Sequence, residues 1–128
     1  MIIRSKANTI LDSLFKGDGI YIGLSTTTPN ENGGNFTEPT TANGYKRSKL
    51  DVMTAASDGQ TQNNDIIFFA LSREAGWGTI THFGIFSAQY GGTPYYTGEL
   101  TPAVQIPAGY IPIFDVGALK IGLDKEVT

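Results

Sequence analysis

Residues 75–88 read Ala-Gly-Trp-Gly-Thr-Ile-Thr-His-Phe-Gly-Ile-Phe-Ser-Ala, and they contain the only tryptophan and the only histidine of the chain. Two glycines flank Trp77, and small or polar residues then alternate with large apolar ones. Such alternation is typical of a β-strand with a buried face. The stretch therefore predicts a tight loop that leads into a buried strand from Thr79 to Ser87, with Trp77 as its aromatic anchor.

The N-terminal residues have a different period. Apolar residues recur every three or four positions up to Phe15, and polar residues occupy the opposite side. This pattern predicts an amphipathic helix over residues 1–16. Lys16 and Gly17 favour a helix end there, since a cation suits the C-terminal dipole and glycine readily adopts positive φ.

Short apolar or alternating segments follow the helix, with turn residues between them. The basic side chains of residues 44–50 favour the edge of a sheet. Pro112 favours an edge strand or a bulge. The apolar segment 66–71 predicts a strand covered on both faces. The predicted strands are residues 20–25, 44–50, 66–71, 79–87, 95–100, 104–106, 110–114 and 117–123.

These elements together predict the fold class. The class is mainly β, an antiparallel jelly-roll-like β-sandwich with one N-terminal α-helix. We expect one sandwich domain over residues 1–128. Within it, residues 26–43 are rich in Thr, Asn, Gly and Pro and predict a long surface loop. Such loops are often functional or form interfaces, and a partly disordered excursion is the alternative. Residues 54–64 are polar and also predict a loop.

The low charge of the chain limits its functions. Of its 128 residues 16% are charged, the formal net charge is −3, and cysteine is absent. An average globular domain has about 25% charged residues, so the low charge indicates surface hidden in an oligomer. The longest basic cluster is residues 46–49, which is too small a footprint for nucleic-acid binding. The lack of cysteine excludes disulfides and thiolate metal sites.

The sequence contains no apolar run of the roughly 18–20 residues that a membrane span requires. Polar residues interrupt the apolar positions near the N-terminus, unlike the core of a signal peptide. We therefore expect no membrane partner, no signal peptide, and folding in the cytoplasm of the cell that makes the protein.

Residues suited to catalysis or metal binding are sparse. His82 is the only possible histidine base, and no nucleophile or acid is nominated as its partner, so a half-buried structural histidine is the favoured interpretation. Asp18-Gly19 and Asp58-Gly59 are turn signals first, although a Ca²⁺ site in a loop stays open. We predict no catalytic residue, no metal and no cofactor. A small hydrolase that uses His82 is the least favoured alternative.

Aromatic residues are the remaining candidates for a binding surface. Tyr90, Tyr95 and Tyr96 lie near Gly91-Gly92 and are candidates for a loop-borne platform that contacts a sugar ring or a protein partner. The alternative is that they are core or subunit-contact residues. A second set of residues, from the stretch around the tryptophan, is interpreted as structural markers of the fold, and the tryptophan is expected to close one end of the sandwich. These markers are Gly76, Trp77, Gly78 and His82.

Three parts of the chain carry a likeness to known proteins. They are Leu14 to Pro29, Thr37-Glu38-Pro39 with Gly44-Tyr45-Lys46-Arg47, and residues 75–88 with Tyr95 to Leu100 and Leu119 to Leu123. In this order they resemble the phage tail-fibre family of small virion proteins over nearly the whole chain. Lys46 departs from the small residue that is more usual there, and the loop from Asn30 to Thr37 resembles an insertion.

The resemblance implies a non-enzymatic virion structural protein, as a tail-fibre or particle-decoration component that acts through protein–protein contacts. The expected partners are other virion proteins and the chain itself, as a homo-oligomer for which a trimer is expected. The alternative is a carbohydrate- or receptor-binding module at a fibre tip, with a host-surface glycan as its partner. The expected location is the virion.

Overall fold

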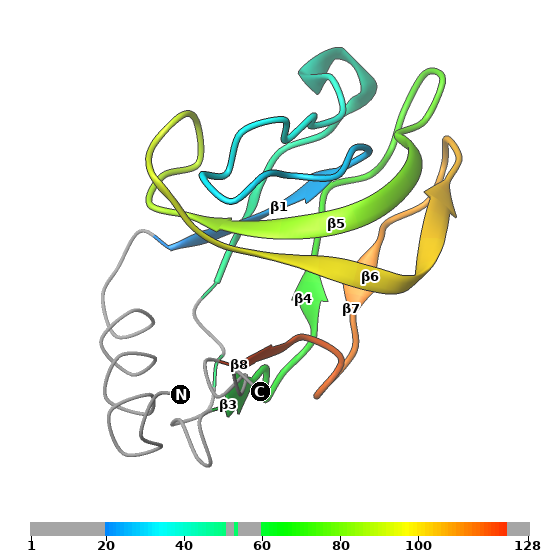
Figure 1. The fold of residues 1–128 in the computed structure, drawn as a ribbon. Coiled ribbons are helices and arrows are strands. Elements are labelled where there is room, and N and C mark those ends of the chain that lie inside the picture. The colour runs from blue at the N-terminus through cyan, green and yellow to red at the C-terminus, as the bar shows by residue number, and fades with distance from the viewer. Residues whose placement is uncertain (1–19, 51–52, 54–59, 123–128) are drawn as a thin grey trace. The chain divides into compact units, whose positions relative to one another are not determined.

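A computed structural model describes residues 20–50, 53 and 60–122, and within them the protein is mainly β (Figure 1). The strands form one four-stranded sheet and two two-stranded sheets. The pairs β1–β2, β1–β5, β5–β6 and β3–β8 are antiparallel. The predicted mainly β, antiparallel class is therefore confirmed, whereas the predicted helix at residues 1–16 lies outside the described residues.

The chain divides into two compact units. One contains residues 1–18, 50–67 and 114–128, and the other contains residues 19–49 and 68–113. The described part has one short 3-10 helix, η1 (Thr41–Asn43). Its strands are β1 (Tyr21–Ser25), β2 (Ser48–Lys49), β3 (Gln60–Gln62), β4 (Ile67–Phe68), β5 (Gly78–Phe86), β6 (Pro94–Ile106), β7 (Ile113–Phe114) and β8 (Lys120–Gly122).

The four-stranded sheet has the order β2-β1-β5-β6 and belongs to the unit of residues 19–49 and 68–113. The long strands β5 and β6 run side by side across Figure 1. Ile22 and Leu24 of β1 are buried, as are Ile80 and Ile85 of β5. Burial of such side chains contributes about 1.5–3 kcal/mol each, so these two strands supply much of the core of this unit.

Glycine lets an aromatic ring lie flat on the sheet at one position. Gly98 of β6 is opposite Phe83 of β5, and a Cβ on Gly98 would come within 2.5 Å of the Phe83 ring. The Tyr96 ring stacks on Phe83 from the same strand, with ring centroids 6.0 Å apart. A side chain at residue 98 would therefore displace a buried aromatic residue.

The strands of this unit differ from the predicted ones in length and burial. The predicted strands 95–100 and 104–106 are one strand, β6, because the ladder with β5 continues from Gly98 to Val104 across a register shift. The predicted strand 66–71 shortens to β4, and its expected burial on both faces is wrong, since Phe68 and Leu71 are exposed. Two apolar side chains of this segment are thus exposed to solvent.

The predicted loop 26–43 is held by hydrogen bonds. The Ser25 hydroxyl accepts from the Thr37 amide (3.0 Å), and the Thr26 amide donates to the Thr37 carbonyl (2.9 Å). At the tip, the Asn30 side chain accepts from the Gly34 amide (2.9 Å). These bonds fold the loop back on itself.

The other unit contains the small sheet of β3 and β8. Thr61 and Ile121 are opposite each other and buried, beside buried Leu119. Fully buried Asn63 crosslinks the segment: its Oδ1 accepts from the Leu119 amide (3.0 Å) and its Nδ2 donates to the Asp115 carbonyl (2.8 Å). The predicted loop 54–64 is wrong at residues 60–62, because polar β3 pairs with β8, a strand distant in sequence.

Candidate functional site

The sequence-predicted His82 lies in β5 and is half-buried. Its Nδ1 is 2.8 Å from the Thr81 hydroxyl, the neighbouring side chain. Residue 82 is opposite Ser25 of β1 and Glu99 of β6 in the ladder. Among the described residues no nucleophile–base–acid arrangement forms around it, so a hydrogen-bonded strand histidine describes its position.

Glu38, Tyr45 and Arg47 form a polar cluster in the unit of residues 19–49 and 68–113, and Tyr45 and Arg47 are buried in it. The Glu38 carboxylate accepts from Arg47 Nη2 (2.8 Å) and Nε (3.0 Å), and from the Tyr45 hydroxyl. Arg47 is 8% exposed and Glu38 is 24% exposed. A two-point Arg–carboxylate pair of this kind is stronger and more directional than a single contact.

Arg47 also holds the turn between β5 and β6. Its Nη1 donates to the Ala88 carbonyl (2.9 Å) and to the Gly91 carbonyl (2.7 Å). The guanidinium lies over the Phe86 ring, with Cζ 3.7 Å from the ring centroid, which adds a cation–π contact. One buried side chain therefore fixes the backbone on both sides of Tyr90.

Tyr45 connects this cluster to β1. The Leu24 amide donates to its hydroxyl (2.9 Å) while the hydroxyl donates to Glu38. Burial, followed by the hydrogen bond to the Glu38 carboxylate, raises the pKa of the Tyr45 phenol above its usual value. The phenol is therefore held in its neutral, hydrogen-donating form.

Trp77 packs beside Tyr45. The two rings meet edge to face with centroids 5.2 Å apart, and Trp77 Nε1 donates to the Asn43 carbonyl (2.9 Å). The Trp77 amide donates to the Ile106 carbonyl (2.8 Å), where a Cβ on Gly76 would come within 2.7 Å of that oxygen. Gly76 and Gly78 have φ of 81° and 78°, which side chains disfavour. Residues 76–78 thus take part in the packing and backbone hydrogen bonding of this unit.

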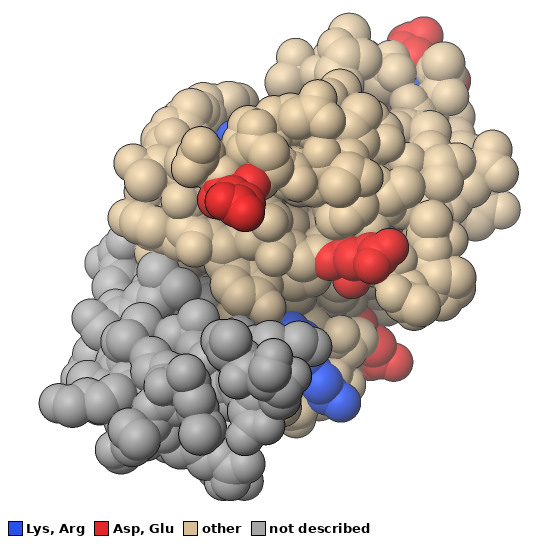
Figure 2. Space-filling view, in the orientation of Figure 1, with Lys and Arg blue, Asp and Glu red and all other residues tan. Residues whose placement is uncertain are grey.

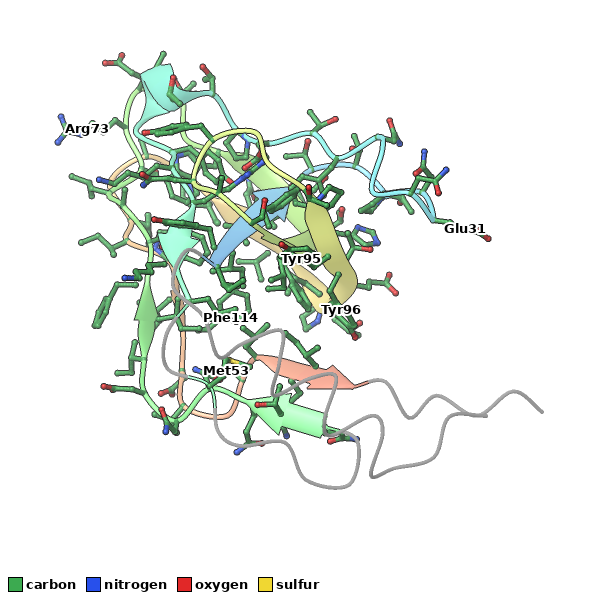
Figure 3. The ribbon with its side chains drawn as sticks, turned by 90° about the vertical axis from the view of Figure 1, so that its left-hand side faces the viewer. Glu31, Met53, Arg73, Tyr95, Tyr96 and Phe114 are labelled. Atoms are coloured by element: carbon green, nitrogen blue, oxygen red, sulfur yellow. The ribbon has the colours of Figure 1, made fainter. Side chains whose placement is uncertain are left out.

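The three candidate tyrosines do not share one site. Tyr90 lines an open groove with η1 and the segment after it, whereas Tyr95 and Tyr96 line another groove of about 240 Å³ beside the turn at residues 31–33. Figure 3 shows Tyr95 and Tyr96 near each other, with Arg73 and Glu31 on opposite sides of them. The structure therefore brings together Tyr95 and Tyr96 and places Tyr90 elsewhere.

Sequence reasoning missed the roles of Glu38 and Arg47. The basic residues of 44–50 predicted an exposed sheet edge, and β2 is indeed an edge strand, but Arg47 is buried and paired. Its partners are nine to 44 positions away in sequence. The sequence signal that could have indicated this pair is Glu38 before Tyr45 and Arg47 after it, in a chain with few charged residues.

The described residues contain no group of three or more side chains suited to holding a metal ion. Within the same part of the chain, no helix has the length and apolar character needed to cross a membrane. Figure 2 shows a face that is largely uncharged, with acidic side chains that stand apart from one another. These observations leave grooves and apolar faces as the candidate sites.

The comparisons with known proteins identify one family. A family model described as podophage GP4 fiber I protein gp80 matches residues 2–122. No curated protein matches the chain. The matched range includes the three segments that resemble phage tail-fibre proteins, except for Leu123 at the end of the third, and that predicted likeness is confirmed. The chain therefore belongs to the podophage GP4 fiber I protein gp80 family.

Proposed function

We propose that this chain is a non-enzymatic structural component of a phage virion, in a tail fibre or in particle decoration. It acts through protein–protein contacts with other virion proteins and with copies of itself, as a trimer. Membership of a phage fibre family supports the virion role. The observation that carries the self-association is a group of exposed apolar side chains close together in the fold, called the ribbon face below.

This face lies on the ribbon formed by residues 67–72 and 110–114. The strands β4 and β7 pair, and the Phe69 amide donates to the Pro112 carbonyl (2.9 Å). Phe68 is 63% exposed, Ile111 55% and Ile113 47%. Leu71 and Tyr110 extend the apolar surface. These five side chains define the ribbon face.

The size of the ribbon face suits the centre of an interface. With roughly 180 Å² per side chain, about half of it exposed, the five residues present roughly 450 Å². The largest apolar patch of a monomeric protein is roughly 300–600 Å² and is often functional. A standard interface buries about 800 Å² per partner, so the ribbon face would supply its apolar core.

Light scattering coupled to size exclusion tests this proposal. We expect a trimer at micromolar concentration, and we expect the double variant Phe68→Ser/Ile111→Thr to be a folded monomer. The matched control is Val104→Thr in β6, since Val104 is 47% exposed and lies outside the ribbon face. A wild-type monomer would contradict the self-association, and an unchanged double variant would exclude the ribbon face.

A second candidate function is receptor binding at a fibre tip. The observation that favours it is the exposure of two tyrosines, Tyr90 at 68% and Tyr95 at 46%, because exposed aromatic rings stack on sugars. Screening on a glycan array, repeated with Tyr90→Ala and Tyr95→Ala, tests it. Loss of signal in one variant would identify the groove, and an absence of any binding would argue against this function.

We propose also that the complete chain folds as the predicted single jelly-roll-like sandwich with a helix at residues 1–16. The antiparallel sheets support the sandwich. Backbone chemical shifts over residues 1–16 test the helix, since values typical of a coil or strand would contradict it.

A further inference from the structure

The groove beside Tyr90 has a volume of about 470 Å³ and is open to solvent. Six of its lining residues matter here: Thr41, Lys46, Ala70, Leu71, Arg73 and Tyr90. All belong to the unit of residues 19–49 and 68–113. Ligand sites commonly have volumes of about 300–1,000 Å³, so the groove has room for one or two sugar rings.

The charge of the groove is positive. Lys46 and Arg73 are exposed and line it, and no carboxylate lines it among the described residues. Glu38 lines a smaller hollow of about 150 Å³ that shares Lys46 and Tyr90 with the groove, and its carboxylate is already paired with Arg47. In a chain with a net charge of −3, two cations gathered around one exposed tyrosine favour an anionic ligand.

The walls of the groove are held in place by the backbone. The Arg73 amide donates to the Asn43 carbonyl (2.8 Å), which joins the segment 70–73 to η1. Gly44 allows this approach, because a Cβ there would come within 2.4 Å of the Leu71 carbonyl oxygen. Arg73 therefore projects from a fixed frame, and it extends away from the body of the unit in Figure 3.

The aromatic wall is also fixed. Arg47 Nη1 donates to the carbonyls of Ala88 and Gly91, on either side of Tyr90. A ring presented on a held backbone loses less conformational entropy when it binds. The buried Glu38–Arg47 pair therefore has a consequence at the surface, since it positions the Tyr90 turn.

We propose that this groove binds an acidic saccharide. The Tyr90 ring stacks on the apolar face of a sugar, and Lys46 and Arg73 bind its carboxylate or sulfate group. Thr41 adds a hydroxyl for the sugar hydroxyls. This assignment rests on the receptor-binding function proposed above. It adds the chemical class of the ligand, and it assigns the ligand to the Tyr90 groove and not to the Tyr95 groove.

Calorimetric titration of the full chain with paired probes tests the assignment. The acidic probes are a galacturonate trimer, sialyllactose and a sulfated disaccharide, and their neutral partners are the galacturonate methyl ester, lactose and the unsulfated disaccharide. We expect at least one acidic probe to bind about tenfold more tightly than its neutral partner at low salt, and we expect added salt to reduce this preference.

The variants separate the aromatic contribution from the charge contribution. Tyr90→Ala should weaken binding about tenfold for acidic and neutral probes alike, and Lys46→Gln/Arg73→Gln should remove the preference for the acidic one. The matched controls are Tyr95→Ala in the other groove and Lys49→Gln, an exposed lysine of β2. Both controls should bind as the wild type does.

Each contrary result has a separate meaning. Equal binding of acidic and neutral probes through Tyr90 would overturn the charge selectivity and leave receptor binding intact. Loss of binding in Tyr95→Ala, with Tyr90→Ala unchanged, would overturn the choice of groove. If no acidic or neutral probe bound at millimolar concentration, both the assignment and the receptor-binding function would be wrong.

Discussion

Removing the Glu38 carboxylate should destabilise the protein strongly. In Glu38→Ala the Arg47 guanidinium, 8% exposed, keeps its charge and loses its two contacts to the carboxylate at 2.8 and 3.0 Å. The buried Tyr45 hydroxyl loses its acceptor as well. An uncompensated buried charge costs about 3–5 kcal/mol. Because Glu38 is partly exposed and water can reach the site, we expect a loss of about 3 kcal/mol.

A double-mutant cycle isolates this effect from the loss of packing. Arg47→Met removes the charge and keeps much of the side-chain volume. The double variant Glu38→Ala/Arg47→Met should be more stable than the sum of the single losses implies, by about 1.5–3 kcal/mol, because no unpaired cation remains.

Urea denaturation followed by tryptophan fluorescence is a suitable assay, since Trp77 packs against Tyr45. Glu31→Ala is the matched control, because Glu31 is an exposed residue of the loop tip, and it should change stability by less than about 0.5 kcal/mol. If Glu38→Ala were no less stable than this control, or if the single losses simply added, the cluster would not have the role argued from its geometry.

Two further predictions concern other buried polar groups. The pKa of Tyr45 is raised by burial and by Glu38, so the stability that the neutral phenol contributes is intact below about pH 10 and falls as the pH rises further. Between pH 9 and 11 the wild type should lose about 1.4 kcal/mol more of its free energy of unfolding than Tyr45→Phe does, as measured by urea titrations. Equal losses in the two proteins would contradict this. Asn63→Ala should destabilise β3 and β8 by about 1–3 kcal/mol, because the buried Leu119 amide loses its acceptor and the Asp115 carbonyl keeps only the Ala118 amide as a donor. Hydrogen exchange of β8 measures this, with exposed Asn64→Ala as a control that should leave exchange unchanged.

The strands that the sequence predicted best are those with clear alternation and a strongly buried face. The prediction for residues 20–25 matches β1, and that for 79–87 matches β5 within one residue. Hydrophobic alternation did not predict β3, because residues 60–62 are all polar and only Thr61 of them is buried. It also failed for residues 66–71, since an apolar run does not reveal whether another layer covers it.

The candidate site was harder to predict because its contacts join distant positions. The Tyr90 turn is fixed by Arg47, more than 40 positions earlier. Tyr90 and Tyr95 are close in sequence, yet β6 begins between them and carries Tyr95 to another groove. Proximity in sequence therefore suggested one aromatic platform, whereas the sheet separates its members.

The pairing of β3 with β8 has a consequence for how the chain is made. All strands of the four-stranded sheet have been synthesised once the chain reaches residue 106, whereas β3 can pair with β8 only after residues 120–122 have been added. Domains generally fold as units during synthesis, at about 5–20 residues per second. The larger sheet is therefore able to form on the nascent chain first, and a stop codon shortly after residue 113 would leave that sheet intact while β3 lost its only described partner strand.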